Sequence, residues 1–567
     1  MLEKFLPRQE FSSYEDFKAN YRITIPERFN FAYDVVDEWA RQDEKKLAIA
    51  WMGNAMQERF YTFADVSRLS NQAANLFRDH GIRKGDRVLL ILKQRPEVWI
   101  CMVALHKIGA VVIPANFQFK RHDLEYRFTA AKVKTVVTVD LAEVLAEVLP
   151  AAEACPSVQE VLVVGDDVPA GLFDWRKEVA RYPVKWEKPV GDDYPCLQDP
   201  MLLYFTSGTT GMPKMMIHDF TLPIGHIVTA KYWQCVEDGT LHMTAADSGW
   251  GKFAWGKIYG QWICGACSAS YDYDGRFVAH DMLQAISRFK LASFCAPPTI
   301  YRFLVKEDLG QADFSSIRHC AIAGEPLNPE VYHQWLKQTG LELREGFGQT
   351  ESSVLMANFP WLAVKPGSTG KFSPLFELDI VDEEGNSCED GIVGRLVIHH
   401  AKSRRQPGLI RDYVDEPDAW TGDDYFTGDT VWRDEDGYIW FHGREDDVIK
   451  SSGYRIGPFE VESAIMQHPA VLECAVTAYP DPARGEAVKA TVVLAKNGNW
   501  TPGPELTKEI QTLVKKVTAP YKYPRLVEYV EELPKTTSGK IRRKAIRQRD
   551  LEKWEALQGG ANPEAAK

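Results

Sequence analysis

Apolar and polar residues follow two alternating patterns through the first several hundred residues. Apolar positions at helical spacing follow the capping-box pair Thr62 and Asp65, and short apolar runs such as RVLLILK and KTVVTV separate the helical stretches. Continuous apolar runs between helices are typical of strands that are covered on both faces of a sheet. The pattern predicts an α/β fold whose large N-terminal domain contains several subdomains with helix-flanked sheets.

The composition of the sequence changes near DEDGYIWFHGREDDVIKSSGYR, a segment that is rich in turn residues and typical of hairpins. Beyond it, helical and strand patterns alternate over a short distance and predict a small α+β unit. We therefore predict a large domain over residues 1–445, a small C-terminal domain over 446–550 and a flexible tail over 551–567.

Length, charge and cysteine content limit the class of protein. A chain of 567 residues is too long for one core, and a net charge of −12 argues against a protein that coats nucleic acid. The chain start lacks a secretory pattern, and no apolar run approaches the ~18 residues of a membrane span. We expect a cytoplasmic protein without transmembrane segments, in which the closest cysteine pair, Cys264 and Cys267, is structural rather than redox-active or metal-binding.

The segment YFTSGTTGMPK, from Tyr204 to Lys214, predicts an anion-binding loop. Successive backbone N–H groups in a Gly-rich turn, with hydroxyls and a lysine, suit a polyphosphate. The spacing differs from a Walker A loop, because Pro213 precedes the lysine. Similar polar stretches at 324–326 and 346–351 also follow predicted strands, and ligands of open α/β sheets bind beyond the carboxyl ends of strands. One shared site is therefore predicted.

A second candidate loop, GKFAWGKI from Gly251, matches the Walker spacing but lacks the closing Ser or Thr that would ligate Mg²⁺. Phe253 and Trp255 would also fill the phosphate cradle. We interpret this segment as an apolar pocket wall.

Four further motifs, EGFGQTES, YFTGD, GRED and PKTTSGKIRR, follow the loop in order. Together with it they resemble the acyl-adenylate-forming (AMP-binding) enzyme superfamily over nearly the whole chain. The sequence is most similar to medium-chain acyl-CoA synthetases, notably in YFTSGTTGMPKM, GYRIGPFEVESA, HPAVLECAV, DPARGE and VTAPYKYPR. The resemblance implies an acid–thiol ligase. A carboxylate and ATP form acyl-AMP and pyrophosphate, CoA displaces AMP, and a mobile small domain rotates between these half-reactions.

The resemblance also implies a site made by both domains. Lys540, Lys214, Thr350 and Glu351 would be catalytic, and Glu351 would ligate Mg²⁺, which prefers hard carboxylate oxygens. The residues implied to bind ATP or AMP are Thr206, Ser207, Gly208, Thr209, Thr210, Gly211, Lys214, Gly324, Glu325, Pro326, Glu345, Gly346, Phe347, Gly348, Gln349, Thr350, Asp429, Arg444, Arg455 and Lys540.

The CoA site implied by the resemblance depends on rotation of the small domain about a hinge at Asp446. Its residues are Gln118, Ser452, Gly453, Tyr454, Arg484 and Lys515. The position before QTE is aromatic in acetyl-specific relatives, so Gly348 is expected to open room for a longer acid. Trp255 is expected to limit the depth of the pocket. The acyl-pocket residues are Trp250, Gly251, Lys252, Trp255, Cys295 and Gly348.

These features predict a ligase for medium-chain, branched or cyclic carboxylates. The alternatives are a benzoate or aryl-CoA ligase of the same mechanism, an acyl-AMP ligase linked to a carrier protein, a P-loop NTPase and a non-catalytic nucleotide-binding protein. The aromatic residues near the acyl pocket have a simpler interpretation as core. Lys540 is a candidate for acetylation, which would remove its charge. The sequence does not predict the acid, the direction of the reaction or the oligomeric state, so a homo-oligomer stays open.

Overall fold

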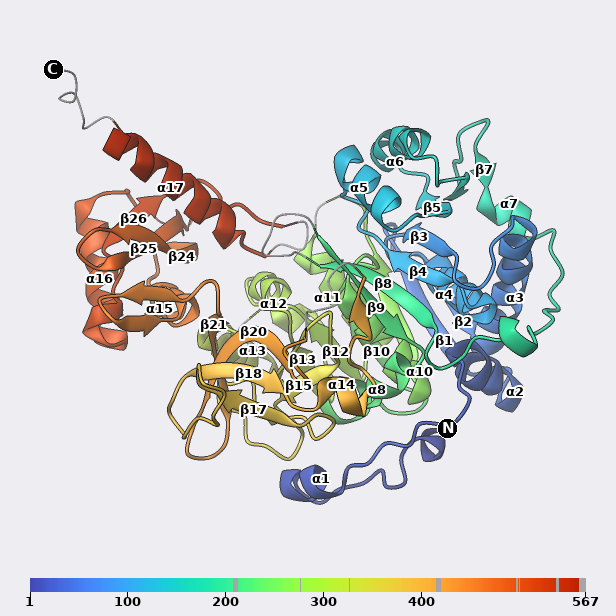
Figure 1. Ribbon diagram of the computed structural model, residues 1–567, viewed down its shortest axis with the longest axis horizontal. Coiled ribbons are helices and arrows are strands. Elements are labelled where there is room, and N and C mark those ends of the chain that lie inside the picture. Colours follow the sequence, from blue (N-terminus) through green and yellow to red (C-terminus); the bar gives the residue numbers. More distant parts are fainter. Residues whose placement is uncertain are drawn as a thin grey trace.

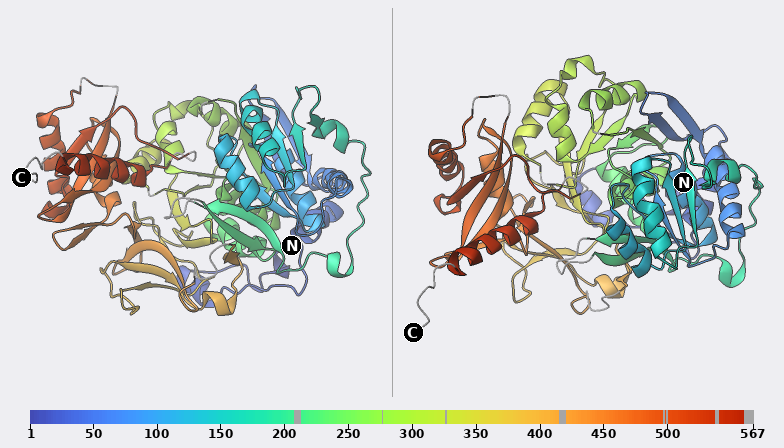
Figure 2. Two further views of the ribbon diagram at one scale, coloured as in Figure 1. Left: turned by 45° about the horizontal axis from the view of Figure 1, so that its top comes forward. Right: turned by 90° about the horizontal axis from the view of Figure 1, so that it is seen from above.

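The computed structural model describes residues 1–206, 213–275, 277–325, 327–414, 420–495, 498, 500–536 and 540–559. The chain forms a large body and a smaller C-terminal unit, which lies beside one end of the body (Figure 1). The same arrangement is visible from two further sides (Figure 2). Within the described residues the strands form four sheets, three in the body and one in the C-terminal unit.

The first large sheet has the strand order β16-β15-β14-β13-β12-β10-β11-β1-β2, with a parallel centre and antiparallel edges. The strands are β1 (Leu47–Gly53), β2 (Glu58–Thr62), β10 (Leu241–Thr244), β11 (Cys267–Asp272), β12 (Ser293–Ala296), β13 (His319–Ile322), β14 (Leu343–Gly348), β15 (Val354–Ala357) and β16 (Lys371–Phe372). The helices between them are α9 (Gly251–Lys257), α10 (Tyr259–Ile263), α11 (Ala279–Phe289), α12 (Pro298–Leu304) and α13 (Pro329–Thr339).

The second large sheet has the order β19-β9-β8-β4-β3-β5-β6-β7, and its strands from β3 to β8 run parallel. The strands are β3 (Arg87–Ile91), β4 (Val111–Pro114), β5 (Thr135–Val139), β6 (Glu160–Val164), β7 (Phe173–Asp174), β8 (Pro200–Thr206), β9 (Lys214–Asp219) and β19 (Asp412–Tyr413). The helices of this region are α1 (Tyr14–Asn20), α2 (Glu38–Gln42), α3 (Phe63–Asp79), α4 (Glu97–Ile108), α5 (Arg121–Ala130), α6 (Ala142–Ala154), α7 (Trp175–Val179) and α8 (Leu222–Gly225).

Local sequence explains where several of these elements begin. Helix α3 starts at the predicted capping box, because the Thr62 hydroxyl accepts from the Asp65 N–H at 3.1 Å and the Asp65 carboxylate accepts in return from the Thr62 N–H, also at 3.1 Å. Helix α4 is buried along its whole length and ends at Gly109, which adopts a left-handed conformation. These two helices lead into β3 and β4.

A small antiparallel sheet joins the body to the C-terminal unit. Its order is β17-β18-β20-β21, and it pairs Asp429 of β20 with Arg444 of β21. Its elements are β17 (Leu378–Val381), β18 (Gly394–Ile398), α14 (Ala401–Arg404), β20 (Tyr425–Arg433) and β21 (Ile439–Arg444).

The C-terminal unit has its own sheet and its own apolar core. Helix α17 continues to Gly559, whereas the sequence predicted a tail from Leu551. The segment LEKWEAL consists of strong helix formers apart from Trp554, so the helix extends beyond its packed first turns. The elements are β22 (Ile449–Ser451), β23 (Tyr454–Ile456), α15 (Pro458–Ile465), β24 (Val471–Asp481), β25 (Gly485–Leu494), α16 (Pro504–Val517), β26 (Leu526–Tyr529) and α17 (Arg543–Gly559).

The predicted α/β class, with a large sheet-containing domain and a smaller C-terminal domain, is confirmed. Cys264 and Cys267 are buried and free, as expected for structural thiols. Within the described ranges, no helix has both the length and the apolar composition that crossing a membrane requires.

The glycine before β16 provides a test of backbone packing. Gly370 has φ +85°, and a Cβ there would lie 2.0 Å from the Ala357 carbonyl oxygen, whereas Gly385 has φ +89° in open space. Gly385→Ala should cost only the conformational penalty, about 1–2 kcal/mol. Gly370→Ala should cost at least about twice as much, because the backbone clash adds to that penalty. Thermal unfolding of both variants checks this, and equal losses would contradict it.

Candidate active site

A cavity of about 1930 Å³ opens where the parallel strands of both large sheets end. Residues that line it follow β3, β4, β8, β10, β11, β12, β13 and β14, and others come from the C-terminal unit. The predicted convergence of polar stretches at strand ends is therefore present in the described residues. Ser207, Gly208, Thr209, Thr210, Gly211 and Pro326, which the resemblance assigns to nucleotide binding, lie outside the described residues.

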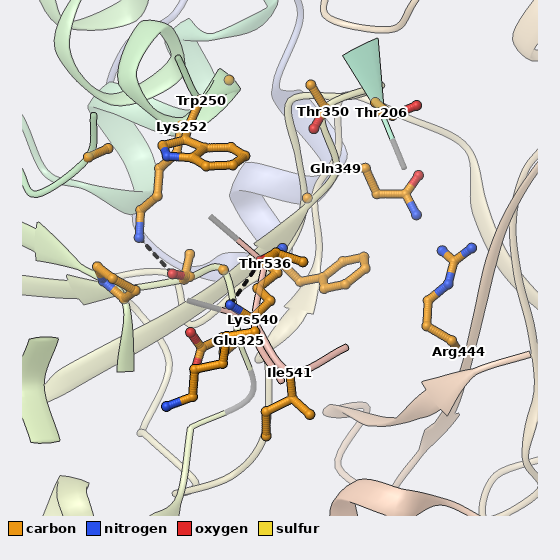
Figure 3. A pocket seen from close by; sticks show the side chains of 18 of the residues that line it. Thr206, Trp250, Lys252, Glu325, Gln349, Thr350, Arg444, Thr536, Lys540 and Ile541 are labelled. Atoms are coloured by element: carbon orange, nitrogen blue, oxygen red, sulfur yellow. Dashed lines mark hydrogen bonds between the residues drawn. The ribbon is translucent and has the colours of Figure 1, made fainter. Parts of the chain in front are cut away.

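A buried carboxylate and an arginine face this cavity from the small antiparallel sheet. Gln349 Nε2 donates to Asp429 Oδ2 at 2.6 Å, and Arg444 Nη1 donates to Asp429 Oδ1 at 3.4 Å. Burial raises the pKa of Asp429 to about 6, although Arg444 and Gln349 oppose the shift. Figure 3 shows Gln349 and Arg444 facing the same space.

The QTE segment is fixed by contacts from distant parts of the chain. His218 Nε2 donates to the Thr350 carbonyl oxygen at 2.8 Å, and burial lowers the pKa of His218 to about 4, so the ring is neutral. Tyr413 donates its hydroxyl to Glu351 Oε1 at 2.9 Å. Among the described residues, no donor reaches Glu351 Oε2. This oxygen is available to a ligand.

Lys540 reaches the cavity from the C-terminal unit (Figure 3). Its backbone is fixed, because the Thr536 N–H donates to the Lys540 carbonyl at 2.7 Å and the Lys540 N–H donates to the Thr536 hydroxyl at 3.1 Å. The following helix, α17, is anchored where Arg543 donates to the buried Glu462 carboxylate at 2.7 Å.

Lys252 lies in the same part of the cavity as Lys540, close enough for the charge of Lys540 to act on it (Figure 3). Its ammonium donates to the Ala323 carbonyl at 2.6 Å, and burial, with a smaller contribution from Lys540, lowers its pKa. Glu325 is held by the Thr299 hydroxyl at 2.9 Å and by Arg302 at 3.4 Å. The predicted Gly324–Glu325 wall is thus part of the cavity.

Glu345 and Gly346, which were predicted to form part of the nucleotide-binding wall, also line the cavity. Burial raises the pKa of Glu345 to about 8. Gly346 lies directly against Trp233, since a Cβ on this glycine would be 2.3 Å from the indole. Sequence reasoning missed Trp233, which ends a short π-helical segment, Val228–Trp233. The glycine inside β14 was the available signal, because such a glycine marks close approach of another group.

The predicted acyl-pocket residues all line the cavity. A Cβ on Gly348 would lie 2.7 Å from the Ser353 carbonyl oxygen, so the backbone approaches this glycine closely. That Gly348 opens room for a longer acid stays a prediction. Trp255 stacks on His226 at 4.7 Å between ring centroids. The remaining members of the set are Trp250, Gly251, Lys252 and Cys295.

The predicted CoA residues are divided between two places. Gln118 lines the cavity, whereas the others lie in the C-terminal unit and do not line it in the described part of the chain. Tyr454 stacks on Tyr521 at 4.0 Å between ring centroids. Arg455, which was predicted to bind ATP or AMP, forms an ion pair with Glu383 and does not line the cavity either. The residues outside the cavity are Ser452, Gly453, Tyr454, Arg484, Lys515 and Arg455.

Comparison with known proteins gives the family. Residues 36–406 match the family model "AMP-binding enzyme", and residues 460–540 match "AMP-binding enzyme C-terminal domain". The chain is 41% identical over 558 residues to acyl-coenzyme A synthetase ACSM3, mitochondrial, of Mus musculus, covering 96% of this chain and 94% of the relative. It is 41% identical over 556 residues to acyl-coenzyme A synthetase ACSM4, mitochondrial, of Homo sapiens, covering 94% and 93%.

Two solved structures share the whole architecture. The anthranilate CoA ligase AuaEII in complex with anthranoyl-AMP has a TM-score of 0.83 at 28% identity, covering 94% of this chain and 99% of that one. The acyl-CoA synthetase of Brucella canis has a TM-score of 0.70 at 30% identity, covering 96% and 100%. The resemblance that the motifs indicated is confirmed, and the chain belongs to the AMP-binding enzyme family.

Proposed function

We propose that the protein is an AMP-forming acyl-CoA synthetase that joins a medium-chain, branched or cyclic carboxylate to CoA through an acyl-AMP intermediate. The observation that carries the proposal is the meeting of Lys540 with Thr350, Glu351, Asp429 and Arg444 around one cavity. Relatives at about 40% identity are named acyl-coenzyme A synthetases, which supports the same class.

The first half-reaction joins two anions, so stabilisation of negative charge should dominate it. Lys214 and Lys540 both line the cavity and supply positive charge, one at the start of β9 and one from the C-terminal unit. The carboxylate oxygen attacks the α-phosphorus, and pyrophosphate leaves. A lysine ammonium between the carboxylate and the α-phosphate gains interaction energy as charge concentrates there in the transition state.

Asp429 and Arg444 are proposed to hold the ribose. A buried carboxylate that is already oriented by Gln349 can accept hydrogen bonds from ribose hydroxyls. Glu345, Gly346 and Gly324 would pack around the adenine.

Mg²⁺ is proposed to bind at Glu351. The residues fit this ion, because Tyr413 orients one carboxylate oxygen and the other faces the cavity without a hydrogen-bond donor from the described residues. Phosphate oxygens would complete the coordination, which is common for Mg²⁺ beside nucleotides. When bound, the ion would neutralise phosphate charge.

Rotation of the small domain is proposed for the second half-reaction. Lys540 lines the cavity while Gly453 and Lys515 lie outside it, so the C-terminal unit has to turn before both sets can act. Asp446 is the proposed hinge, at the boundary between residues 1–445 and 446–550. Its Oδ1 atom lies 3.7 Å from Arg444 Nε.

An aryl acid is the second candidate substrate. A structural neighbour of this chain is an anthranilate CoA ligase with bound anthranoyl-AMP, and the indole of Trp250 borders the cavity here.

A cytoplasmic location and acetylation of Lys540 stay predictions from the sequence. The similar synthetases are named mitochondrial.

Removal of the proposed catalytic lysine should stop adenylation. Lys540→Ala should lower the rate of acyl-AMP formation by about 10²–10³-fold, because transition-state charge loses its partner. Lys553→Ala is the matched control, since this lysine pairs with Glu528 on the outer part of the same unit. Pyrophosphate release from ATP and hexanoate without CoA is the measurement, and an undiminished rate in Lys540→Ala would refute the assignment.

Nucleoside binding should weaken at acid pH. As pH falls through about 6, Asp429 gains a proton and loses an acceptor for the ribose hydroxyls, so affinity should drop about tenfold between pH 8 and pH 5. Adenosine is the probe, because it has no phosphate that titrates in this range. Calorimetry should show no such step in Asp429→Asn, and the same step in that variant would contradict the ribose assignment.

Trp255 should limit acyl length if it forms the end of the pocket. Trp255→Ala should raise kcat/KM for octanoate relative to butyrate by roughly tenfold, since each buried methylene gains contact. Trp500→Ala, which truncates a partly exposed indole of the C-terminal unit, should leave that ratio unchanged. An unchanged ratio in Trp255→Ala would mean that the indole is only core.

A further inference from the structure

Asp247 is a carboxyl group in the cavity wall that has no role in the proposed adenylation step. Asp247 follows β10 and is partly exposed on the cavity. Its Oδ1 atom accepts from the Gly249 N–H at 3.0 Å and from the Asn116 side-chain amide at 3.5 Å. Its Oδ2 atom accepts no hydrogen bond from any described residue. The group is thus oriented through one oxygen while the other is left for a ligand.

The loop that carries Asp247 is held tightly against the end of β4. A Cβ on Gly249 would lie 2.4 Å from the Asn116 backbone nitrogen, so the two loops touch backbone to backbone. Asn116 Oδ1 also accepts from the Gln118 N–H at 2.8 Å. Asn116 therefore connects Asp247 with Gln118, the residue of the proposed CoA set that lines the cavity. On its other side, Asp247 is three residues from Trp250 of the proposed acyl pocket.

The charges around Asp247 suit a proton acceptor near neutral pH. Burial raises its pKa to about 6, and the neighbouring Asp272 carboxylate acts in the same direction. Lys93 and Lys257 oppose the shift, and Tyr273 also faces the group. Lys93 is itself bound to Asp272 at 3.5 Å and to the Tyr273 carbonyl at 2.8 Å.

Four other carboxylates of the cavity already have partners or a proposed role. Glu325 is bound by Thr299 and Arg302, and Asp429 is bound by Gln349 and Arg444. Glu462 is paired with Arg543, and the unbonded oxygen of Glu351 suits Mg²⁺. Asp247 has an accessible oxygen with no such assignment.

We propose that Asp247 accepts the thiol proton of CoA in the second half-reaction, an inference that rests on the proposed synthetase function. The S–H bond breaks and its proton moves to Asp247 Oδ2. The sulfur electron pair forms the bond to the acyl carbonyl carbon, the bond from that carbon to the phosphate oxygen breaks, and AMP leaves with its electrons. The proton passes to solvent when the products leave.

The chemistry of the two groups is compatible. A free thiol has a pKa of about 8.5 and is mostly protonated at neutral pH, whereas Asp247 is mostly ionised there. A positioned base of this strength contributes typically about 10²–10⁴-fold to a rate.

The test separates the two half-reactions in Asp247→Asn. The enzyme is first mixed with ATP, Mg²⁺ and hexanoate, and acyl-AMP is quantified; CoA is then added and thioester formation is followed by rapid quench. Acyl-AMP formation should stay within about twofold of the unsubstituted enzyme, and thioester formation should fall by about 10²–10⁴-fold. Asp274→Asn is the matched control. Asp274 belongs to the same group of charges, since it pairs with Lys93, but its side chain is 52% exposed. Acyl-AMP formation and thioester formation should both be unchanged in this variant.

The outcomes distinguish this inference from the function on which it rests. If the unsubstituted enzyme forms no acyl-AMP, the proposed function fails. If Asp247→Asn transfers the acyl group at the normal rate, the assignment of the base is wrong.

A pH profile decides the matter if Asp247→Asn does not fold. Between pH 5 and 8, the thioester step of the unsubstituted enzyme should rise through about 6. Lys257→Gln should move that midpoint to higher pH, because Lys257, whose own pKa burial lowers to about 7, is charged near pH 6 and lowers the pKa of Asp247. A profile that is flat, or that does not move in Lys257→Gln, would overturn the proposal.

Discussion

In this protein the parallel strands of two large sheets direct their carboxyl ends into one cavity. Parallel strands that end at the same edge of a sheet place the polar groups of their following loops at that edge. The arrangement depends on strands that are covered by helices on both faces, since only then are the sheets stable as parallel structures. Loops that are far apart in sequence therefore meet, and each contributes one or two polar side chains. The nucleotide, the acid and the thiol can be brought together only because this opening is shared.

Burial in that cavity controls the charge of its side chains. Asp429 and Asp247 both have pKa values raised to about 6, and Glu345 has one raised to about 8, because each carboxylate loses water. Asp429, Asp247 and Glu351 each accept a side-chain or backbone hydrogen bond from a neighbour, which fixes their orientation. Such groups need little rearrangement when a ligand arrives, which is the source of preorganised catalysis.

The C-terminal unit has one orientation, in which Lys540 lines the cavity and the hairpin around Gly453 does not. Arg455 contacts Glu383 of the body in this orientation, and Arg543 anchors α17 within the unit. An exposed ion pair such as Arg455 with Glu383 contributes little to stability, so it would not strongly oppose the proposed rotation. The proposed use of two different faces of this unit is consistent with a weak contact of this kind.

The sequence by itself determined the elements and the chemistry of their ends. The capping box at Thr62, the apolar strands and the polar loops that follow them depend on interactions between residues close in the chain, and these can be read locally. The motifs also indicated the family, because their residue types and order are specific.

Tertiary structure decided which residues contact one another across long separations in the sequence. Trp233 packs on Gly346, the Cα of Gly348 faces the Ser353 carbonyl, and Tyr413 orients Glu351. It also decided that Asp247 lies partly exposed in the cavity wall with one unbonded oxygen. No local pattern reports these contacts, since each depends on how whole sheets and loops pack against one another.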